Sequence, residues 1–228
     1  MTRPSILFVH NDFYIINKPA GVTMHDSAQG IISQVLPLVE DSRLYLCHRL
    51  DDGTSGCLIL ARNAAAAARI GELFARRQIQ KYYVALATAK PKKKQGTVSG
   101  DMKNRRQGQH ILLKTREQPA VTQFFSQAVA PGRRGFVVRP LTGKTHQIRV
   151  ALKSLGAPIL GDDLYKGDPA ERLYLHAWQL SFCYQDECIE VTSTPTGELF
   201  EDEACRHWLQ SMEPVAQLAW PNYQLPIN

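Results

Sequence analysis

Short runs of apolar residues, many alternating with polar ones, recur along the chain and predict β-strands. Ten such runs are expected to be strands: Ile6–Val9, Phe13–Ile16, Leu44–Cys47, Cys57–Ala61, Tyr82–Ala87, His110–Lys114, Val121–Val129, Phe136–Leu141, Tyr174–Phe182 and Cys188–Thr192. The pair Asn11-Asp12, between the first two runs, indicates a hairpin turn. The chain is therefore expected to be built mainly around β-structure.

Three segments have the pattern of helices. Asn63 is the expected N-cap of the first, which continues through the alanines 64–68 and an apolar stripe of Ile70, Leu73 and Phe74. The other two are expected from Thr145 to Gly156 and from about Glu198 to Met212. Many strands with few helices, and no regular β-α alternation, predict an α+β fold with a mixed, largely antiparallel sheet core and flanking helices.

The length and composition predict one soluble domain. The 228 residues are 44% hydrophobic and 21% charged, which is ordinary for a globular protein. We expect a single catalytic-size domain over 1–228, with a core at about 6–212 and a tail, 213–228, that wraps the surface. No apolar run reaches the roughly 18 residues of a membrane helix, and the N-terminus is too polar for a secretory signal, so a cytoplasmic protein is expected. We also expect a monomer.

The five cysteines do not form a metal motif. They are odd in number and lack paired CxxC spacing. Cys183 and Cys188 flank an expected turn, where a zinc pair is conceivable, but buried or half-buried reduced thiols are the favoured interpretation for all five. We expect no metal.

The net charge of +6 and the isoelectric point near 9.1 permit a polyanionic partner without requiring one. Basic residues concentrate at Arg76-Arg77, Lys90–Lys94, Lys103–Arg106 and Arg133-Arg134. The second and third runs lie in sequence that is rich in Gly, Pro and Gln and is therefore expected to form loops. Solvated loops and flexible phosphate contacts are both consistent with these runs.

The stretch HRLDDGTSG, residues 48–56, places charges between two apolar runs. In extended backbone Asp51 and Asp52 point to opposite faces, so they cannot form the facing carboxylate pair of a glycosidase. Asp51 is the single candidate for a catalytic carboxylate, and a purely structural role in capping the turn through Thr54 or Ser55 is the alternative.

The stretch RPLTGKTHQIRVALKSLG, residues 139–156, is the second segment in which several candidate catalytic or binding residues lie close together. Thr145 is the expected N-cap of its helix, whose buried face is formed by Ile148, Ala151, Leu152 and Leu155. His146, Arg149 and Lys153 lie on another side. A helix N-terminus with Lys144, His146 and Gln147 suits an anion such as phosphate, although the glycine required for a P-loop is missing.

The stretch QKYYVALAT opens a strand with two adjacent tyrosines. Because successive side chains point to opposite faces, one of Tyr82 and Tyr83 should enter the core and the other a surface or a site. A structural tyrosine is the alternative to a functional one.

Together these segments resemble the RluA family of pseudouridine synthases. HRLDDGTSG matches the family pattern HRLDxxTSG in full, KYY at 81–83 matches KxY, and TGKTHQIRVA matches TGRTHQIRxH except at Lys144 and Ala151. INKPAGVTMH, GAPILGDDLY and RLYLHAWQLSF are similar to three flanking family signatures. The resemblance extends from about Ile6 to Leu199 and implies the pseudouridine synthase catalytic fold.

The resemblance assigns roles to particular residues. It implies that Asp51 is the catalytic aspartate, Arg149 its ion-pair partner, and Tyr83 the aromatic side chain against the target base. Arg49 would help to displace that base from its stack. The remaining motif residues are expected to contact RNA: His48, Thr54, Lys144, His146 and Gln147. Lys144 keeps the positive charge of the family arginine but lacks the planar guanidinium that can bind a phosphate through two parallel hydrogen bonds.

The implied reaction isomerises specific uridines in structured RNA, either tRNA, ribosomal RNA or both. It breaks the bond from ribose to the uracil nitrogen and joins the ribose to carbon 5 of the same base, so no cofactor is expected. Asp51 could attack the anomeric carbon or remove the ribose 2′ proton, and both routes fit the sequence. The uridine must leave its stack, which stacking on Tyr83 and insertion of Arg49 would offset.

Two other classes of function are alternatives. One is a non-catalytic RNA-binding or RNA-chaperone protein on the same fold, against which the combination of Asp51, Tyr83 and Arg149 argues. The other is a glycosidase or nucleosidase that uses Asp51. The first expected strand begins about five residues into the chain, so we expect no S4-like N-terminal domain, and target choice through the basic runs.

Overall fold

The computed structural model describes residues 3–25 and 27–224. They fall into two compact units, which are described separately. The first unit comprises Met1–Tyr83 and Leu175–Thr196, and the second comprises Val84–Tyr174 and Gly197–Asn228. The expectation of one domain remains a prediction.

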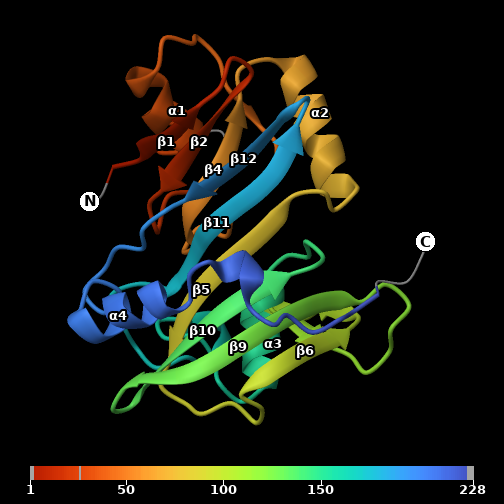
Figure 1. The fold of residues 1–228 in the computed structure, drawn as a ribbon, viewed down its shortest axis with the longest axis vertical. Helices are drawn as coiled ribbons and strands as arrows, with labels where there is room; N and C mark the ends of the chain where they lie inside the picture. Colours follow the sequence, from red (N-terminus) through yellow and green to blue (C-terminus); the bar gives the residue numbers. More distant parts are fainter. Residues whose placement is uncertain (1–2, 26, 225–228) are drawn as a thin grey trace. The chain divides into compact units, whose positions relative to one another are not determined.

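The first unit is built on a mostly antiparallel sheet (Figure 1). Its strands are β1 (Ser5–Val9), β2 (Phe13–Lys18), β3 (Tyr45–Leu46), β4 (Ser55–Ala61), β11 (Leu175–Tyr184) and β12 (Glu187–Thr192). Their order is β1-β2-β4-β11, with β12 on β11 and β3 on β4. The pairing of β11 with β4 is parallel, whereas β1 with β2, β2 with β4, β3 with β4 and β11 with β12 are antiparallel. Every residue of β4 is buried, which explains its continuous apolar sequence.

Helices of the first unit cover part of this sheet. They are α1 (Ile31–Val35), which continues into η1 (Leu36–Leu38), and α2 (Ala64–Ala75). The side chain of Asn63 accepts a hydrogen bond of 2.8 Å from the Ala66 amide, so the predicted N-cap of α2 is confirmed. The α2 helix packs against β3 and β4 through its apolar stripe.

The second unit contains the strands β5-β10-β9-β6 in that order, and β9 pairs antiparallel with both β10 and β6. The strand β5 (Gln80–Ala87) enters it from the first unit, and the others are β6 (Gln95–Gly100), β9 (Ala120–Ala130) and β10 (Arg133–Pro140). The helix α3 (Gln147–Ser154) packs against β9 and β10, and α4 (Glu203–Ser211) packs against β9. The remaining short helices are η3 (Asp163–Tyr165) and η4 (Val215–Gln217).

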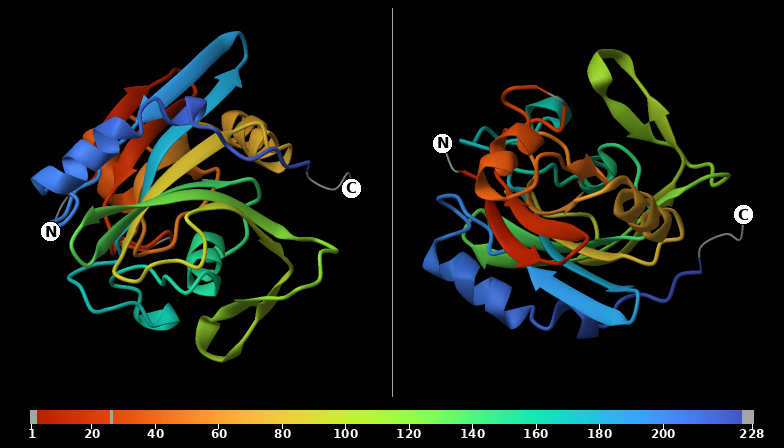
Figure 2. Two further views of the ribbon diagram at one scale, coloured as in Figure 1. Left: turned by 60° about the horizontal axis from the view of Figure 1, so that its bottom comes forward. Right: turned by 90° about the horizontal axis from the view of Figure 1, so that it is seen from above.

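A two-stranded hairpin projects from β6 and β9 in the second unit, in the yellow-green part of Figure 2. Its strands are β7 (Met102–Asn104) and β8 (His110–Leu112), and η2 (Arg106–Gly108) forms its tip. We call the segment 102–112 the basic hairpin, because Lys103, Arg105 and Arg106 are exposed on it. The sequence predicted a loop for residues 103–106, and this was wrong for Lys103 and Asn104, which belong to β7. The strand β6 was also missed, because its residues carry glycine and polar side chains.

All ten predicted strands are confirmed in position, while two helix starts differ. The helix α3 begins at Gln147 rather than Thr145, because His146 adopts a left-handed φ of 57° and ends any earlier helical turn. The predicted cap by Thr145 is therefore wrong. The helix α4 begins at Glu203 rather than near Glu198, and the Asp202 carboxylate caps it by accepting from the Cys205 amide.

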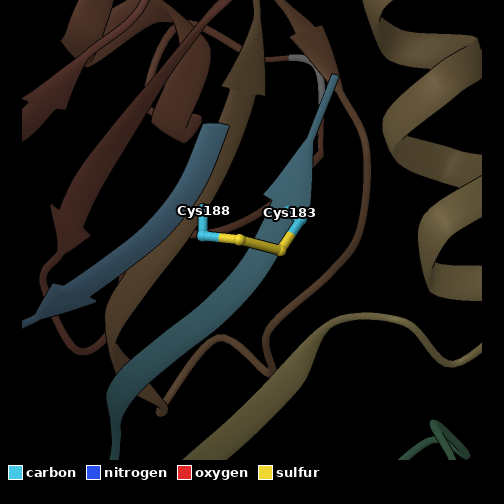
Figure 3. The surroundings of a disulfide bond; sticks show 2 residues. All are labelled: Cys183 and Cys188. Atoms are coloured by element: carbon cyan, nitrogen blue, oxygen red, sulfur yellow. A yellow bond between two sulfur atoms is a disulfide. The ribbon is translucent and has the colours of Figure 1, made fainter. Parts of the chain in front are cut away.

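A disulfide joins Cys183 of β11 to Cys188 of β12 (Figure 3). The two residues are direct partners in the antiparallel register, which brings their side chains together. The prediction of reduced thiols is therefore wrong for this pair, because spacing along the chain did not reveal the register. It is confirmed for Cys47, Cys57 and Cys205, which are half-buried or buried and unbonded.

The tail after α4 lies on the outer strands of the second unit. The Trp220 ring packs 4.8 Å from the Phe125 ring, and the Tyr223 hydroxyl is 3.0 Å from the Ser99 hydroxyl. The prediction that the tail wraps the surface is confirmed as far as residue 224, and residues 225–228 lie outside the described part. In that described part, no helix is long and apolar enough to cross a membrane, and no cluster of residues could hold a metal ion.

Candidate active site

Asp51 begins a tight turn that leads into β4. Its carbonyl oxygen accepts a hydrogen bond of 2.9 Å from the Thr54 amide, and the Asp52 carbonyl accepts one of 2.7 Å from the Gly21 amide. Asp51 is half-buried and Asp52 is exposed. The turn therefore fixes the backbone on which Asp51 lies, and of the two aspartates only Asp52 is exposed.

The side chain of Lys18 supports this turn through hydrogen bonds. The sequence prediction did not include Lys18. Its side chain is fully buried at the end of β2, and its ammonium donates to the carbonyls of Pro19, Val22 and Asp52 at 3.0, 2.7 and 3.0 Å. A buried ammonium needs such acceptors to replace water. Lys18 belongs to the INKPAGVTMH segment, so the quoted signature was the signal that could have found it.

The TSG end of the first motif is fixed by close packing against β11. Gly56 has φ 108°, and a Cβ on it would lie 2.2 Å from the Ala177 carbonyl oxygen. The Ser55 hydroxyl is 2.7 Å from His176 Nδ1, whose Nε2 is 2.8 Å from the Ser193 carbonyl. Because that carbonyl only accepts, Nε2 carries the proton and Nδ1 accepts from Ser55. These contacts explain why serine and glycine end the motif.

Tyr83 lies near Asp51 in the first unit. Burial, and then the negative charge of Asp51, raise the pKa of the Tyr83 hydroxyl above its ordinary value. The neighbouring Tyr82 is almost fully buried in the core. The sequence prediction that one tyrosine enters the core is thus confirmed.

Two basic groups accompany this part of the site. Lys81 is on the same face of β5 as Tyr83, and burial lowers its pKa to about 8. Burial and the positive charge of Lys81 lower the pKa of His48 to about 3. His48 Nε2 accepts a hydrogen bond of 2.9 Å from the Ile59 amide, and its ring stacks on Phe74. His48 is therefore neutral and supports the chain just before the turn.

Arg149 lies in the second unit, on α3. Its guanidinium donates to both carboxylate oxygens of the fully buried Asp162, at 2.8 Å each. The Tyr165 ring lies beneath it, with 5.0 Å from the Arg149 Cζ to the ring centroid. Asp162 and Tyr165 were missed as site residues, and both come from the quoted GAPILGDDLY segment. The pairing of Asp51 with Arg149 remains a prediction.

The other predicted RNA contacts differ in their surroundings. Gln147 is buried, accepts from the Thr142 hydroxyl at 2.7 Å and the Lys144 amide at 3.0 Å, and donates to the Val121 carbonyl at 3.0 Å. It thus connects the TGKTH turn to β9. Arg49 and Lys144 are exposed and His146 is half-buried, whereas Thr54 is buried. A role of these residues in RNA binding remains a prediction.

The first unit thus presents an aspartate on a tight turn with a half-buried tyrosine nearby, and the second unit carries a basic hairpin. Residues 12–154 match the family model of RNA pseudouridylate synthases. The chain belongs to this family and within it to the RluA type, and its relatives include synthases named RluA and ribosomal large subunit pseudouridine synthase C. It is therefore an RNA pseudouridine synthase, an isomerase.

Three relatives illustrate the similarity. An uncharacterised RNA pseudouridine synthase of Haemophilus influenzae is 47% identical over 199 residues, which is 86% of this chain and 89% of the relative. The dual-specificity RNA pseudouridine synthase RluA of Pasteurella multocida is 34% identical over 79% of this chain and 88% of its own. Ribosomal large subunit pseudouridine synthase C of Haemophilus ducreyi is 32% identical, and the match spans 60% of its length.

Solved structures support the same fold. Human RNA pseudouridylate synthase domain containing 1 matches with a TM-score of 0.72 and 26% identity, covering 99% of this chain and 91% of that structure. Human RNA pseudouridylate synthase domain containing 4 matches with a TM-score of 0.71 and 26% identity, covering 90% and 92%. The predicted α+β fold with a mixed, largely antiparallel sheet is thereby confirmed.

Proposed function

We propose that this pseudouridine synthase uses Asp51 as its catalytic aspartate on uridines in tRNA, ribosomal RNA or both. Arg149 would pair with that carboxylate, Tyr83 would form the wall against the base, and Arg49 would help to displace the base from its stack. The reaction rearranges one glycosidic bond and requires no cofactor. We also propose that the protein acts as a monomer in the cytoplasm, where these RNAs function.

The observation that carries the proposal is the combination of Asp51 and Tyr83 at one place in the first unit. The charge of Asp51 contributes to the raised pKa of the Tyr83 hydroxyl, so the two groups are close enough to interact. The turn that presents Asp51 is held by Lys18 and by the Gly21 amide. A carboxylate held in this way is pre-positioned for attack on a ribose, or for removal of its 2′ proton, without reorganisation during the reaction.

The proposed residue types fit a base that is flipped out and stays in the site. Taking a uridine from its stack costs a few kcal/mol, which stacking on an aromatic side chain can offset. Because the detached uracil must rotate before it is rejoined through carbon 5, a wall such as Tyr83 would keep it near the ribose. Arg49 is exposed next to the turn and is therefore accessible to RNA.

The choice between RNA classes is proposed to depend on exposed basic residues of the second unit. The side chains of Lys92, Lys93 and Lys94 are exposed, while their backbone is held by bonds from the Lys92 amide to Leu155 and from the Ser126 amide to Lys94. The basic hairpin presents three more cations. Such groups would bind phosphates around a structured loop, and binding would weaken steeply with salt.

Replacing Asp51 with asparagine tests the catalytic role, and Asp52→Asn is the matched control. Both variants remove one carboxylate from the same turn, but Asp52 is exposed. Chemical mapping of pseudouridine in treated RNA should show product from wild type and Asp52→Asn, and a loss of more than about 10³-fold for Asp51→Asn. Equal product from Asp51→Asn and wild type would overturn the assignment. Release of free uracil would instead indicate a nucleosidase.

A comparison of pseudouridine maps of total RNA, from cells with and without the gene, identifies the substrate class. Loss of sites confined to tRNA, confined to ribosomal RNA, or in both decides between the three possibilities. An unchanged map would count against modification of either RNA class. Size-exclusion chromatography with light scattering tests the monomer, and a dimer mass would contradict it.

A further inference from the structure

The Tyr165 hydroxyl joins three separate elements of the second unit. It accepts a hydrogen bond of 2.9 Å from the backbone amide of His110, on β8 of the basic hairpin. It also lies 3.0 Å from Nδ1 of His146, the N-cap residue of α3. Tyr165 itself ends η3 and is 5% exposed, so these bonds are largely shielded from water. A single hydroxyl thus connects the hairpin to the start of the helix that carries Arg149.

The ring and backbone of the same tyrosine support Arg149. The Tyr165 ring lies beneath the Arg149 guanidinium, and the Tyr165 amide donates to Asp162 Oδ1 at 3.2 Å. Asp162 in turn binds Arg149 through two bonds of 2.8 Å. The guanidinium is therefore fixed by a carboxylate at its edge and an aromatic ring on its face, and both of these depend on η3.

The basic hairpin is attached to η3 at a second point. Gln109 Nε2 donates to the Leu164 carbonyl at 3.1 Å, next to the bond from His110 to Tyr165. Lys103 on β7 is exposed, and so are Arg105 and Arg106 between β7 and β8. The basic hairpin and the support of Arg149 are therefore both attached to η3.

We propose that Tyr165 is a positioning residue with two roles: its hydroxyl holds the basic hairpin for contact with RNA, and its ring orients Arg149. The hydroxyl tethers the hairpin and the ring orients the guanidinium, so the two functions can be separated by substitution. This inference rests on the proposed function, in which the hairpin binds RNA phosphates and Arg149 serves the catalytic carboxylate.

Tyr165→Phe removes the hydroxyl and keeps the ring. We expect RNA affinity, measured as a dissociation constant for a substrate RNA, to weaken about tenfold, as the loss of shielded hydrogen bonds implies. The single-turnover rate at saturating RNA should stay within about twofold, because Arg149 keeps both supports. Tyr165→Leu, which also removes the ring, should lower that rate as well. Tyr223→Phe is the matched control, since it removes a hydroxyl bond to Ser99 in the tail, and it should change neither quantity.

Asp162→Asn tests the second proposed role, the orientation of Arg149. It removes the charged partner of Arg149 and leaves the hydroxyl tether intact. The single-turnover rate should fall about tenfold or more, with a smaller change in affinity. If Tyr165→Phe and Asp162→Asn lowered affinity and rate in the same proportion, both residues would be merely structural and the proposed division would be wrong.

A double-mutant cycle tests the coupling to the hairpin directly. Neutralising the hairpin with Lys103→Gln, Arg105→Gln and Arg106→Gln removes the contacts that the tether is proposed to position. In this background, Tyr165→Phe should weaken RNA binding by no more than about twofold. A full tenfold effect in the neutral background, or no effect in the native one, would overturn the inference.

Hydrogen exchange gives a measurement that does not depend on activity. The His110 amide, which donates to Tyr165, should exchange faster in Tyr165→Phe, and unchanged exchange would contradict the tether. If Tyr165→Phe fails to fold, Gln109→Ala removes the neighbouring attachment and should weaken RNA binding in the same direction. Failure of these tests, in an enzyme that still makes pseudouridine through Asp51, would refute the positioning role of Tyr165 and leave the proposed function standing.

Discussion

Replacing Gly56 with alanine tests whether the turn of the first motif depends on close packing between β4 and β11. The new Cβ would lie 2.2 Å from the Ala177 carbonyl oxygen and 2.8 Å from its carbonyl carbon and its nitrogen. All three atoms belong to backbone, so relief requires the two strands to separate. Their parallel register pairs Ala177 with Gly56, which leaves no side chain that could move aside.

The magnitude follows from two contributions. A non-glycine residue at φ 108° costs about 1–3 kcal/mol, and overpacking a filled site costs about 1–3 kcal/mol more. We therefore expect Gly56→Ala to lower the free energy of unfolding by about 4 kcal/mol, a large share of the roughly 5–15 kcal/mol typical of a domain. Urea unfolding followed by circular dichroism measures this change.

Gly71→Ala is the matched control. Gly71 lies within α2, has no heavy atom within 4 Å of an added Cβ, and has ordinary helical backbone. The substitution should stabilise the protein by about 0.5–1 kcal/mol, because alanine favours the helix. If Gly56→Ala unfolded within about 1 kcal/mol of wild type, the argument from close backbone approach would be refuted.

Three further predictions concern stability. In the folded protein the pKa of His48 is lowered to about 3, so below about pH 6.5 the unfolded chain binds a proton that the folded chain does not. Between pH 7 and pH 5, the free energy of unfolding of wild type should therefore fall by about 2 kcal/mol relative to that of His48→Gln. Parallel curves of stability against pH for the two proteins would contradict this. Lys18→Met leaves the Pro19 and Val22 carbonyls without their donor and should lower the free energy of unfolding in urea by about 2–4 kcal/mol. The control Lys92→Met, at an exposed position, should lower it by under about 0.5 kcal/mol. Equal effects of the two substitutions would count against the proposed support by the Lys18 hydrogen bonds. Trp220→Ala removes the packing on Phe125 and the indole bond to Val215, so limited proteolysis should cut the tail faster than in wild type, and unchanged cleavage would show that the tail is held by other contacts.

Much of the fold could be predicted because strand and helix patterns are local. Buried runs such as that of β4 and the capped helix after Asn63 carry their own signals. The errors occurred where local chemistry competes with the pattern. His146 adopts a left-handed conformation that no propensity indicates, and the polar, glycine-containing β6 becomes a strand only by pairing with β9.

The candidate site was predictable only in part. Asp51, Tyr83 and Arg149 were assigned from motifs, and their roles remain predictions. Their supports were not found, because Lys18 and Asp162 act through contacts with groups that only the folded chain brings near. The disulfide was missed for the same reason, since it depends on the register of β11 with β12.

The sequence by itself determined the residue types of the chemistry and the local elements that carry them, because periodicity and turn preferences act over a few residues. The tertiary structure decided which groups meet. Ser55 and His176 are separated by 121 residues and form one hydrogen bond, and Tyr165 joins a hairpin to a helix start 19 residues away. Such contacts depend on strand order and packing, which are properties of the whole unit and are not encoded at any one position.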